Sequence, residues 1–156
     1  ALVTGRGPEI VTNLEGRRPL VLDADVVVFG PRDASEAAAN GSQPVASTLY
    51  AMNFQAVREL SIERAARRAV DRLESGGSSG FWVHFDVDVL DDTIMPAVDY
   101  HLPDGLGWHE MIAVLTTATA SRLFTGLEVT IFNPTLDPER RIAAALVDAL
   151  VAGISR

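Results

Sequence analysis

The chain is predicted to fold as an α/β protein with three layers, α/β/α, around a mainly parallel sheet. Two observations predict this class. Apolar runs rich in Val and Phe, typical of buried strands, occur at residues 26–29, 49–52, 81–85 and 123–129. Segments with helical spacing of apolar residues alternate with these runs, and such alternation is typical of parallel sheets.

The first two strands, residues 26–29 and 49–52, are separated by the turn-forming residues 40–44. Ser61 is placed to cap a helix that ends near residues 76–77. The apolar positions of this helix share one face: Ile62, Ala66, Ala69, Val70 and Leu73. Its arginines alternate with acids, which indicates a solvated face.

The glycine- and serine-rich residues 75–80 form a flexible turn before the strand at residues 81–85. A second helix is expected over residues 108–120, before the strand at residues 123–129. A third helix is expected over residues 138–152. Its inward positions are Ile142, Leu146, Ala149 and Leu150.

The length of the chain favours a single domain. It has 156 residues, of which 47% are hydrophobic, and this is enough for one core. Both linkers are short, so residues 1–156 are treated as one domain. The chain opens at Ala1 instead of Met, and we therefore expect a fragment, a cleavage product or the partner of a separate N-terminal half.

Composition excludes several classes of function. The formal net charge of −8 argues against nucleic acid, whose phosphates require a basic surface. Cysteine and lysine are both missing, which excludes disulfides, thiol catalysis and Schiff-base chemistry. The sequence shows neither a signal peptide nor an apolar run that could span a bilayer. We expect a cytoplasmic protein without membrane or nucleic-acid partners.

Two aspartates separated by one residue follow the strand at residues 81–85. Because strand side chains alternate between faces, Asp86 and Asp88 are expected on one face, with Phe85 and Val87 packed on the other. Adjacent carboxylates raise one another's pKa, a conflict that a divalent cation removes. Oxygen ligands favour magnesium, calcium or manganese. In the alternative interpretation, the strand runs into a solvated turn and both acids cap backbone amides.

The residues after the aspartates favour the metal site. An irregular loop leaves the carboxyl end of the strand, where sites form in open α/β sheets. The run at residues 85–91, FDVDVLD, resembles the second metal-binding motif of the arginase and agmatinase ureohydrolases. The resemblance covers essentially the whole chain, through residues 3–9, 25–30, 32–33, 95–97, 105–106, 126–130 and 133–134.

The resemblance implies the C-terminal part of an arginase-like fold. It implies that Asp86 and Asp88 ligate a pair of manganese ions, which activate water to attack a guanidinium carbon and release urea. In that family the aspartate that matches Asp91 supports the loop and the ligands. The family tends to form trimers or hexamers, so a homo-oligomer is expected.

Most of that family's metal site is missing from the sequence. The other ligands come from an earlier histidine and an Asp-x-His-x-Asp stretch, and no such stretch occurs here. Two carboxylates cannot saturate two octahedral ions. The chain alone is therefore expected to be incomplete and inactive, and none of its residues is assigned a catalytic role. Asp92 also replaces the usual proline, a change expected to affect the turn more than the site.

Substrate recognition also departs from the family. Three positions before Pro134, arginases and agmatinases place a glutamate that grips the guanidinium, and this chain has Ile131. The substitution removes a charge-assisted hydrogen bond. Glu128 matches another acidic position and is a candidate pocket residue, but odd spacing turns it to the face opposite Ile131.

Each of the three histidines has a separate interpretation. His84 shares the face of Asp86 and can donate to a ligand carboxylate, but we favour a histidine buried in the core. The resemblance places His101 near the mouth of the site, as a candidate pocket residue, with simple exposure as the alternative. His109 begins a helix and is interpreted as a surface residue.

We expect the complete protein to be a manganese-dependent hydrolase that cleaves a linear C–N bond outside peptides, in a guanidino or amidino compound. A neutral or differently charged substrate would not need the missing glutamate. The competing hypothesis is a non-catalytic relative that serves as a structural or regulatory subunit. Ile131 is the best support for that hypothesis.

Overall fold

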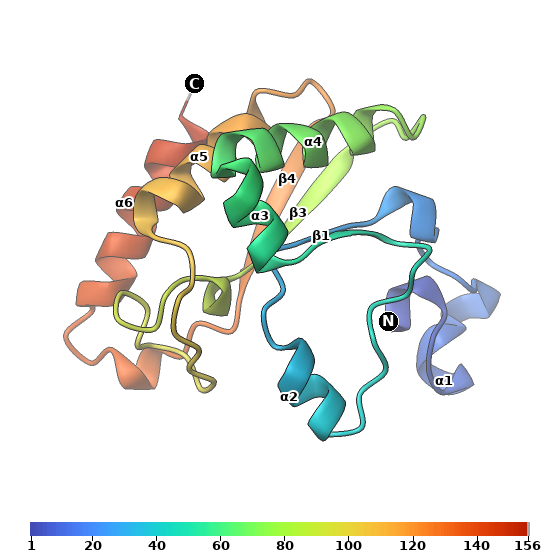
Figure 1. Cartoon of the computed structure of the whole chain (residues 1–156), viewed down its shortest axis with the longest axis horizontal. Helices are drawn as coiled ribbons and strands as arrows, with labels where there is room; N and C mark the ends of the chain where they lie inside the picture. The colour runs from blue at the N-terminus through green and yellow to red at the C-terminus, as the bar shows by residue number, and fades with distance from the viewer. Residues whose placement is uncertain (156) are drawn as a thin grey trace.

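The computed structural model describes residues 1–155, in which helices and strands alternate along the chain (Figure 1). The strands are β1 (Val27–Phe29), β2 (Tyr50–Met52), β3 (Phe81–Asp86) and β4 (Phe124–Thr130). The α-helices are α1 (Glu9–Thr12), α2 (Ala34–Ala39), α3 (Phe54–Leu60), α4 (Ile62–Glu74), α5 (Trp108–Thr119) and α6 (Arg141–Ile154).

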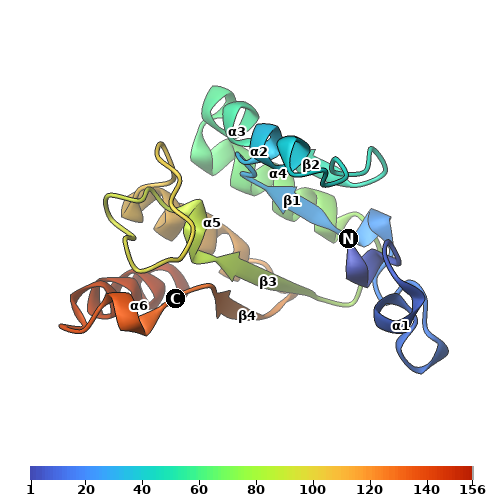
Figure 2. The same cartoon turned by 90° about the horizontal axis from the view of Figure 1, so that it is seen from below.

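The four strands form two parallel pairs. β1 pairs with β2, and β3 pairs with β4 from Phe81 opposite Phe124 to Asp86 opposite Thr130. The strands follow one another as β2, β1, β3, β4 in Figure 2, and no strand pairing joins β1 to β3 within residues 1–155. The α/β class with parallel strands is confirmed.

The two pairs run in the same direction. Before both strands begin, the Ser78 hydroxyl donates a hydrogen bond to Asp25 Oδ1 at 3.4 Å. After both strands end, a Cβ added at Gly30 would lie 3.4 Å from a methyl group of Val89. The carboxyl ends of β1 and β3 therefore meet at one edge of the molecule.

Helices α4, α5 and α6 pack side by side, and the core lies between them and one face of the β3–β4 pair. Phe85 of β3 and Leu115 of α5 belong to the main core cluster, and Phe81 lies in a smaller cluster with Val70 of α4. The opposite face of the pair is exposed, with Trp82 at 58%. No helix of the described residues is long and apolar enough to cross a membrane.

The predicted helices are present with small shifts. Helix α4 begins after Ser61, but the Ser61 hydroxyl makes no cap hydrogen bond and its φ is 74°. Helix α6 begins at Arg141, three residues later than expected, because Pro134–Leu136 forms a separate 3-10 turn. The buried Asp137 carboxylate then accepts a hydrogen bond from the Ala143 N–H at 2.8 Å, inside the first turn of α6. The short helices α2 and α3 were not predicted.

The two ends of the irregular loop after β3 contact each other. Leu90 and Leu106 form a parallel bridge, and the Leu106 N–H donates to the Val89 carbonyl at 2.9 Å. Met95 within the loop is completely buried in the main core cluster. Asn133, after β4, also holds the loop, because its N–H donates to the Ala97 carbonyl at 2.8 Å. The loop is therefore irregular but firmly attached.

Candidate metal site

Two carboxylates lie where β3 ends. The strand stops at Asp86, and Val87–Val89 form a 3-10 turn, η4. Asp88 therefore lies in a turn, and the strand alternation expected from the sequence does not extend to it. Phe85 and Val87 are buried as predicted, at 7% and 0% exposure. Asp86 and Asp88 are partly exposed.

The two aspartates contact each other directly. The backbone N–H of Asp88 donates a hydrogen bond to Asp86 Oδ1 at 3.3 Å. Asp86 therefore caps a backbone amide, which is one part of the alternative interpretation, in which both acids do so. A carboxylate has several lone pairs on two oxygens, so this bond does not prevent Asp86 from also binding a cation.

The Asp86–Asp88 pair is electrostatically strained. Burial raises the pKa of the Asp88 carboxyl to about 6, and the neighbouring Asp86 carboxylate and its hydrogen bond add to the rise. The positive charge of Arg32 opposes the shift, whereas Asp33 adds to it. A divalent cation would stabilise both carboxylates in their ionised form. The pair therefore has the chemistry of a cation site.

Asp91 joins the two ends of the loop beside this pair. Its Oδ1 accepts hydrogen bonds from the Thr93 hydroxyl and, at 3.0 Å, from the Thr93 N–H. Its Oδ2 accepts from the Gly105 N–H at 3.2 Å. The Thr93 hydroxyl contributes most to holding the pKa of the Asp91 carboxyl below its usual range. The structure thus gives Asp91 a contact at each end of the loop.

His84 and Glu128 form an exposed pair on adjacent strands. His84 Nδ1 lies 2.8 Å from Glu128 Oε1, and the two side chains are 59% and 52% exposed. The interpretation of His84 as a core histidine is therefore wrong, because the face of β3 that carries it is open to solvent. Its observed partners are Glu128 and, at 3.5 Å from Nε2, the Thr130 hydroxyl, and not an aspartate of the pair.

The other sequence-predicted residues lie in exposed positions. His101 is exposed within the loop, and His109 is exposed in the first turn of α5, as expected. Ile131 directly follows Thr130, which pairs with Asp86 across the strands. Ile131 is 50% exposed and has a φ of 71°, a left-handed conformation that a β-branched residue rarely adopts.

Arg32 is a residue whose role the sequence did not reveal. It follows β1, and its Nη2 donates hydrogen bonds to the carbonyls of Leu90 at 3.0 Å and Leu102 at 2.9 Å. Its Nε donates to the Pro103 carbonyl at 3.3 Å. Arg32 thus connects the end of β1 to both ends of the loop that follows the aspartates. The sequence signals were its position after a buried strand and its place in the family resemblance, and neither gave its role.

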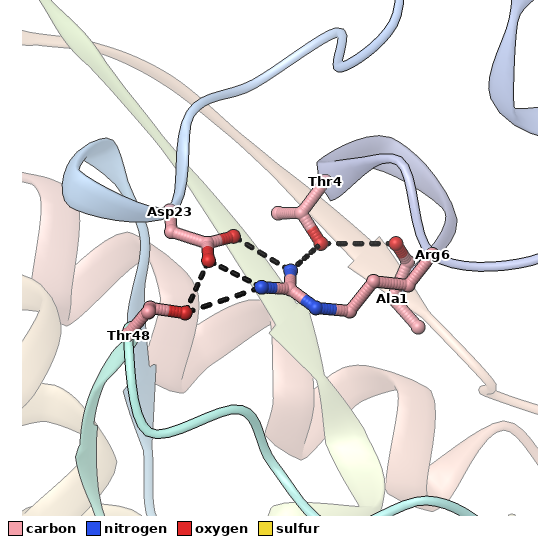
Figure 3. A network of polar contacts seen from close by, with 5 residues as sticks. All are labelled: Ala1, Thr4, Arg6, Asp23 and Thr48. Atoms are coloured by element: carbon pink, nitrogen blue, oxygen red, sulfur yellow. Dashed lines mark hydrogen bonds and ion pairs between the residues drawn. The ribbon is translucent and has the colours of Figure 1, made fainter.

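A second polar network, around Arg6, lies before the start of β1 and away from the aspartates (Figure 3). Arg6 Nη1 donates to Asp23 Oδ1 at 2.6 Å and to Thr4 Oγ1 at 2.7 Å. Thr48 contacts both Arg6 and Asp23. The Arg6 hydrogen bond is the main cause that lowers the pKa of the Asp23 carboxyl to about 2. This network attaches the N-terminal segment to the chain on both sides of β1.

The comparison with family models agrees with this arrangement. The model of the Arginase family matches residues 16–154. The chain belongs to the arginase family. The matched residues include all four strands and the Asp86–Asp88 pair.

Individual arginases match the chain over much of its length. The arginase of Bacillus subtilis is 25% identical over 154 residues, which are 97% of this chain and 51% of the relative. The arginase of Brucella melitensis is 28% identical over 132 residues, 85% of this chain and 42% of the relative. The chain thus spans about half the length of the curated relatives it matches.

Solved arginase structures share the fold. A crystal structure of Bacillus subtilis arginase aligns with a TM-score of 0.83 and 21% identity, covering 100% of this chain and 54% of that one. The arginase of Bacillus caldovelox aligns with a TM-score of 0.81 and 22% identity, covering 99% of this chain and 50% of that one. The fold of the chain is therefore that of part of an arginase.

The Asp86–Asp88 pair supplies only some of the ligands that a metal ion would need. Asp86 and Asp88 supply hard oxygen ligands beside each other. Among residues 1–155, however, no group of three or more His, Cys, Asp or Glu side chains could hold a metal ion. Two carboxylates leave most coordination positions of two octahedral ions open. Within residues 1–155, Asp86 and Asp88 are therefore the two carboxylates that would hold such an ion, without a third His, Cys, Asp or Glu side chain in the same group.

Proposed function

We propose that the complete protein is a manganese-dependent hydrolase that cleaves a linear C–N bond of a guanidino or amidino compound. The observation that carries this proposal is the Asp86–Asp88 pair, at the carboxyl end of a parallel strand in an arginase-family chain. Matching relatives are named arginase and, in Streptomyces lavendulae, N(omega)-hydroxy-L-arginine amidinohydrolase. A guanidino substrate for this chain is inferred from those names.

In this proposal Asp86 and Asp88 hold a pair of manganese ions together with ligands from outside the described chain. Such a pair, when bound, supplies a strong oxygen nucleophile near neutral pH. Asp91 would keep the adjacent loop in place through its contacts with Thr93 and Gly105. The two aspartates would orient the ions.

Residues 1–156 alone are proposed to be inactive, as the C-terminal part of a longer protein. Support comes from the length of the relatives, of which the chain spans about half. The neighbouring strands β1 and β3 give further support, because they do not pair with each other. Each of the two therefore has one edge without a strand partner in residues 1–155. We propose that the missing ligands come from the part that completes this sheet.

We propose that the substrate is not arginine, because of the residue at position 131, which is Ile131. This residue is apolar and 50% exposed, and it directly follows β4, whose last residue, Thr130, pairs with Asp86. It offers no charge to a guanidinium, whereas His101 and Glu128 are exposed polar residues that remain candidates for the pocket. A compound that presents a neutral group to this position therefore suits Ile131 better. We further propose that the protein is a cytoplasmic homo-oligomer.

The test uses the full-length gene product, loaded with manganese and incubated with a panel of guanidino and amidino compounds. Release of urea or the related amide is expected, and Asp86→Asn or Asp88→Asn should reduce it at least about 100-fold. Asp71→Asn, an exposed change on α4, serves as the control for one lost negative charge. A manganese-loaded protein that hydrolyses none of the compounds contradicts the proposal.

A non-catalytic role is the second candidate, because the apolar Ile131 and the incomplete ligand set both favour it. In this case the full-length protein would bind no manganese. Asp86→Asn separates the two candidates. It should remove metal binding if the pair is a ligand set, whereas it should lower only the free energy of unfolding if Asp86 merely caps the turn at Asp88.

A further inference from the structure

The outer side of helix α4 carries a hollow in which positive charge is concentrated. Helix α3 ends at Leu60 and α4 begins at Ile62, and the chain turns sharply between them (Figure 1). A hollow of about 510 Å³, open to solvent, lies at this corner. It is lined by one apolar, one acidic and three basic residues, which are Leu60, Glu63, Arg64, Arg67 and Arg68.

The three basic residues, Arg64, Arg67 and Arg68, are called the α4 arginine cluster. All three are exposed, and within residues 1–155 none of their side chains forms an ion pair or a hydrogen bond. Glu63 and Asp71 lie one helical turn before and after Arg67, but neither carboxylate forms an ion pair in the described chain. The positive charges of the cluster are therefore not neutralised by nearby acids.

The arginines of the cluster are also close to one another. Residues three and four positions apart on an α-helix are neighbours, with Cβ atoms about 5–6 Å apart. Arg64 therefore lies beside both Arg67 and Arg68. Like charges at this spacing repel one another and destabilise a helix. An anion bound between the guanidinium groups would offset this repulsion.

The cluster has the chemistry of an anion site. A guanidinium group presents planar N–H donors in a fork that matches the oxygens of a phosphate group. The volume of the hollow lies within the range of small-molecule pockets, about 300–1,000 Å³. Unpaired charges are costly to bury in a protein interior, so the cluster does not have the composition of a surface that another part of the fold covers. Its ligand would therefore arrive from solvent.

We propose that the α4 arginine cluster binds a small anion that carries two or more linked phosphate groups. Three guanidinium groups along one face of a helix suit adjacent phosphates better than a single one. Leu60, at the end of α3, forms the apolar side of the hollow and packs against the main core cluster. Asp86 and Asp88 do not line this hollow, so the inference is independent of the proposed hydrolase function.

The test is a calorimetric titration of the metal-free, full-length gene product with inorganic pyrophosphate. Binding of one pyrophosphate per chain is expected, and Arg64→Gln with Arg68→Gln should weaken it at least about tenfold. Arg17→Gln with Arg122→Gln is the matched control, because these two arginines are exposed, lie outside the hollow and lose the same charge. The control variant should bind pyrophosphate as the wild type does.

Three results would overturn the proposal. The first is unchanged binding by the cluster variant, and the second is an equal loss of binding in the control variant. The third is binding of sulfate as tight as that of pyrophosphate, since the cluster would then attract counter-ions in general. Sulfate is expected to bind at least about tenfold more weakly, because it has a single tetrahedral group.

Folding and assembly are checked on the same variants. Circular dichroism and thermal unfolding confirm the fold, and Arg67→Gln alone replaces the double variant if that variant unfolds. Light scattering measures the oligomeric state. A cluster variant with fewer subunits than the wild type, in a protein that binds no pyrophosphate, would assign the arginines to contacts between subunits and overturn the proposal. Neither metal nor substrate is present, so failure here is distinct from a failure to release urea.

Discussion

The backbone N–H of Asp88 donates a hydrogen bond to the Asp86 carboxylate at 3.3 Å, which holds two acidic side chains together at the end of β3. The contact stabilises the turn and at the same time brings like charges close. Burial is the main cause that raises the pKa of the Asp88 carboxyl to about 6, and the neighbouring Asp86 carboxylate adds to the rise. The pH dependence of stability therefore depends on this pair, as does the proposed binding of metal.

The first prediction concerns pH. The folded chain holds a proton on Asp88 up to about pH 6, whereas in the unfolded chain this carboxyl ionises near its ordinary value of 3.8. The Asp88 contribution to stability is therefore most favourable below pH 3.8, falls as the pH rises to about 6, and stays low above it. Asp88→Asn should remove this fall. Urea unfolding at a series of pH values measures this fall in the free energy of unfolding, and Asp71→Asn is the control. Equal pH profiles for Asp88→Asn and the wild type would contradict the assignment of the fall to Asp88.

The second prediction concerns manganese. Titration of residues 1–156 by calorimetry should show weak binding, with a Kd on the order of millimolar or weaker, because two carboxylates supply few of the ligands an ion needs. Asp86→Asn should abolish it. Tight binding of two ions would show that the chain completes the site with residues that form no three-member cluster in the described structure.

The third prediction concerns Arg32. Arg32→Ala removes hydrogen bonds to the carbonyls of Leu90, Leu102 and Pro103, and should lower the free energy of unfolding by about 1–3 kcal/mol. Hydrogen exchange should also increase in residues 99–104. Arg17→Ala, at an exposed position near the N-terminus, is the control. Unchanged exchange in the loop would show that Arg32 does not hold it.

The fourth prediction concerns Gly105. A Cβ at this position would lie 2.3 Å from the backbone nitrogen of Asp91, a collision that no side-chain movement can relieve. Gly105→Ala should therefore destabilise the chain by about 2 kcal/mol or more. Gly107→Ala is a close control, because its Cβ would meet only the Glu110 side chain, at 3.7 Å. Thermal unfolding compares the two, and similar melting temperatures would be the contradictory result.

The fifth prediction concerns Ile131. A left-handed conformation costs a β-branched residue about 1–2 kcal/mol, and glycine adopts it freely. Because Ile131 has a φ of 71° and is half exposed, Ile131→Gly should raise the free energy of unfolding by about 0.5–1 kcal/mol. Val129→Gly, within β4, should lower it. Destabilisation by Ile131→Gly would mean that side-chain contacts outweigh the backbone strain.

Much of the fold followed from periodicity in the sequence. The four strands and the helices α4, α5 and α6 have long apolar patterns, and each lies within a few residues of its expected place. Helices α2 and α3 have six and seven residues, too few to show a helical period. Short helices of this kind are fixed by their contacts with the rest of the chain.

The candidate site was only partly predictable. The Asp86–Asp88 pair was found from its spacing, but the strand ends at Asp86, so face alternation misplaced Asp88. His84 was expected in the core, but the face of β3 that carries it is open to solvent. The contacts of Arg32 join residues at least 58 positions apart, a separation that local patterns cannot reveal.

The bridge between Leu90 and Leu106 has a consequence for how the chain can diversify. It closes the base of the loop between them, and Asp86 and Asp88 lie outside that closed segment. Residues inserted or deleted near the exposed His101 would change the loop without moving the two aspartates. The length of this loop can thus vary, while the strand that carries the acidic pair stays in place.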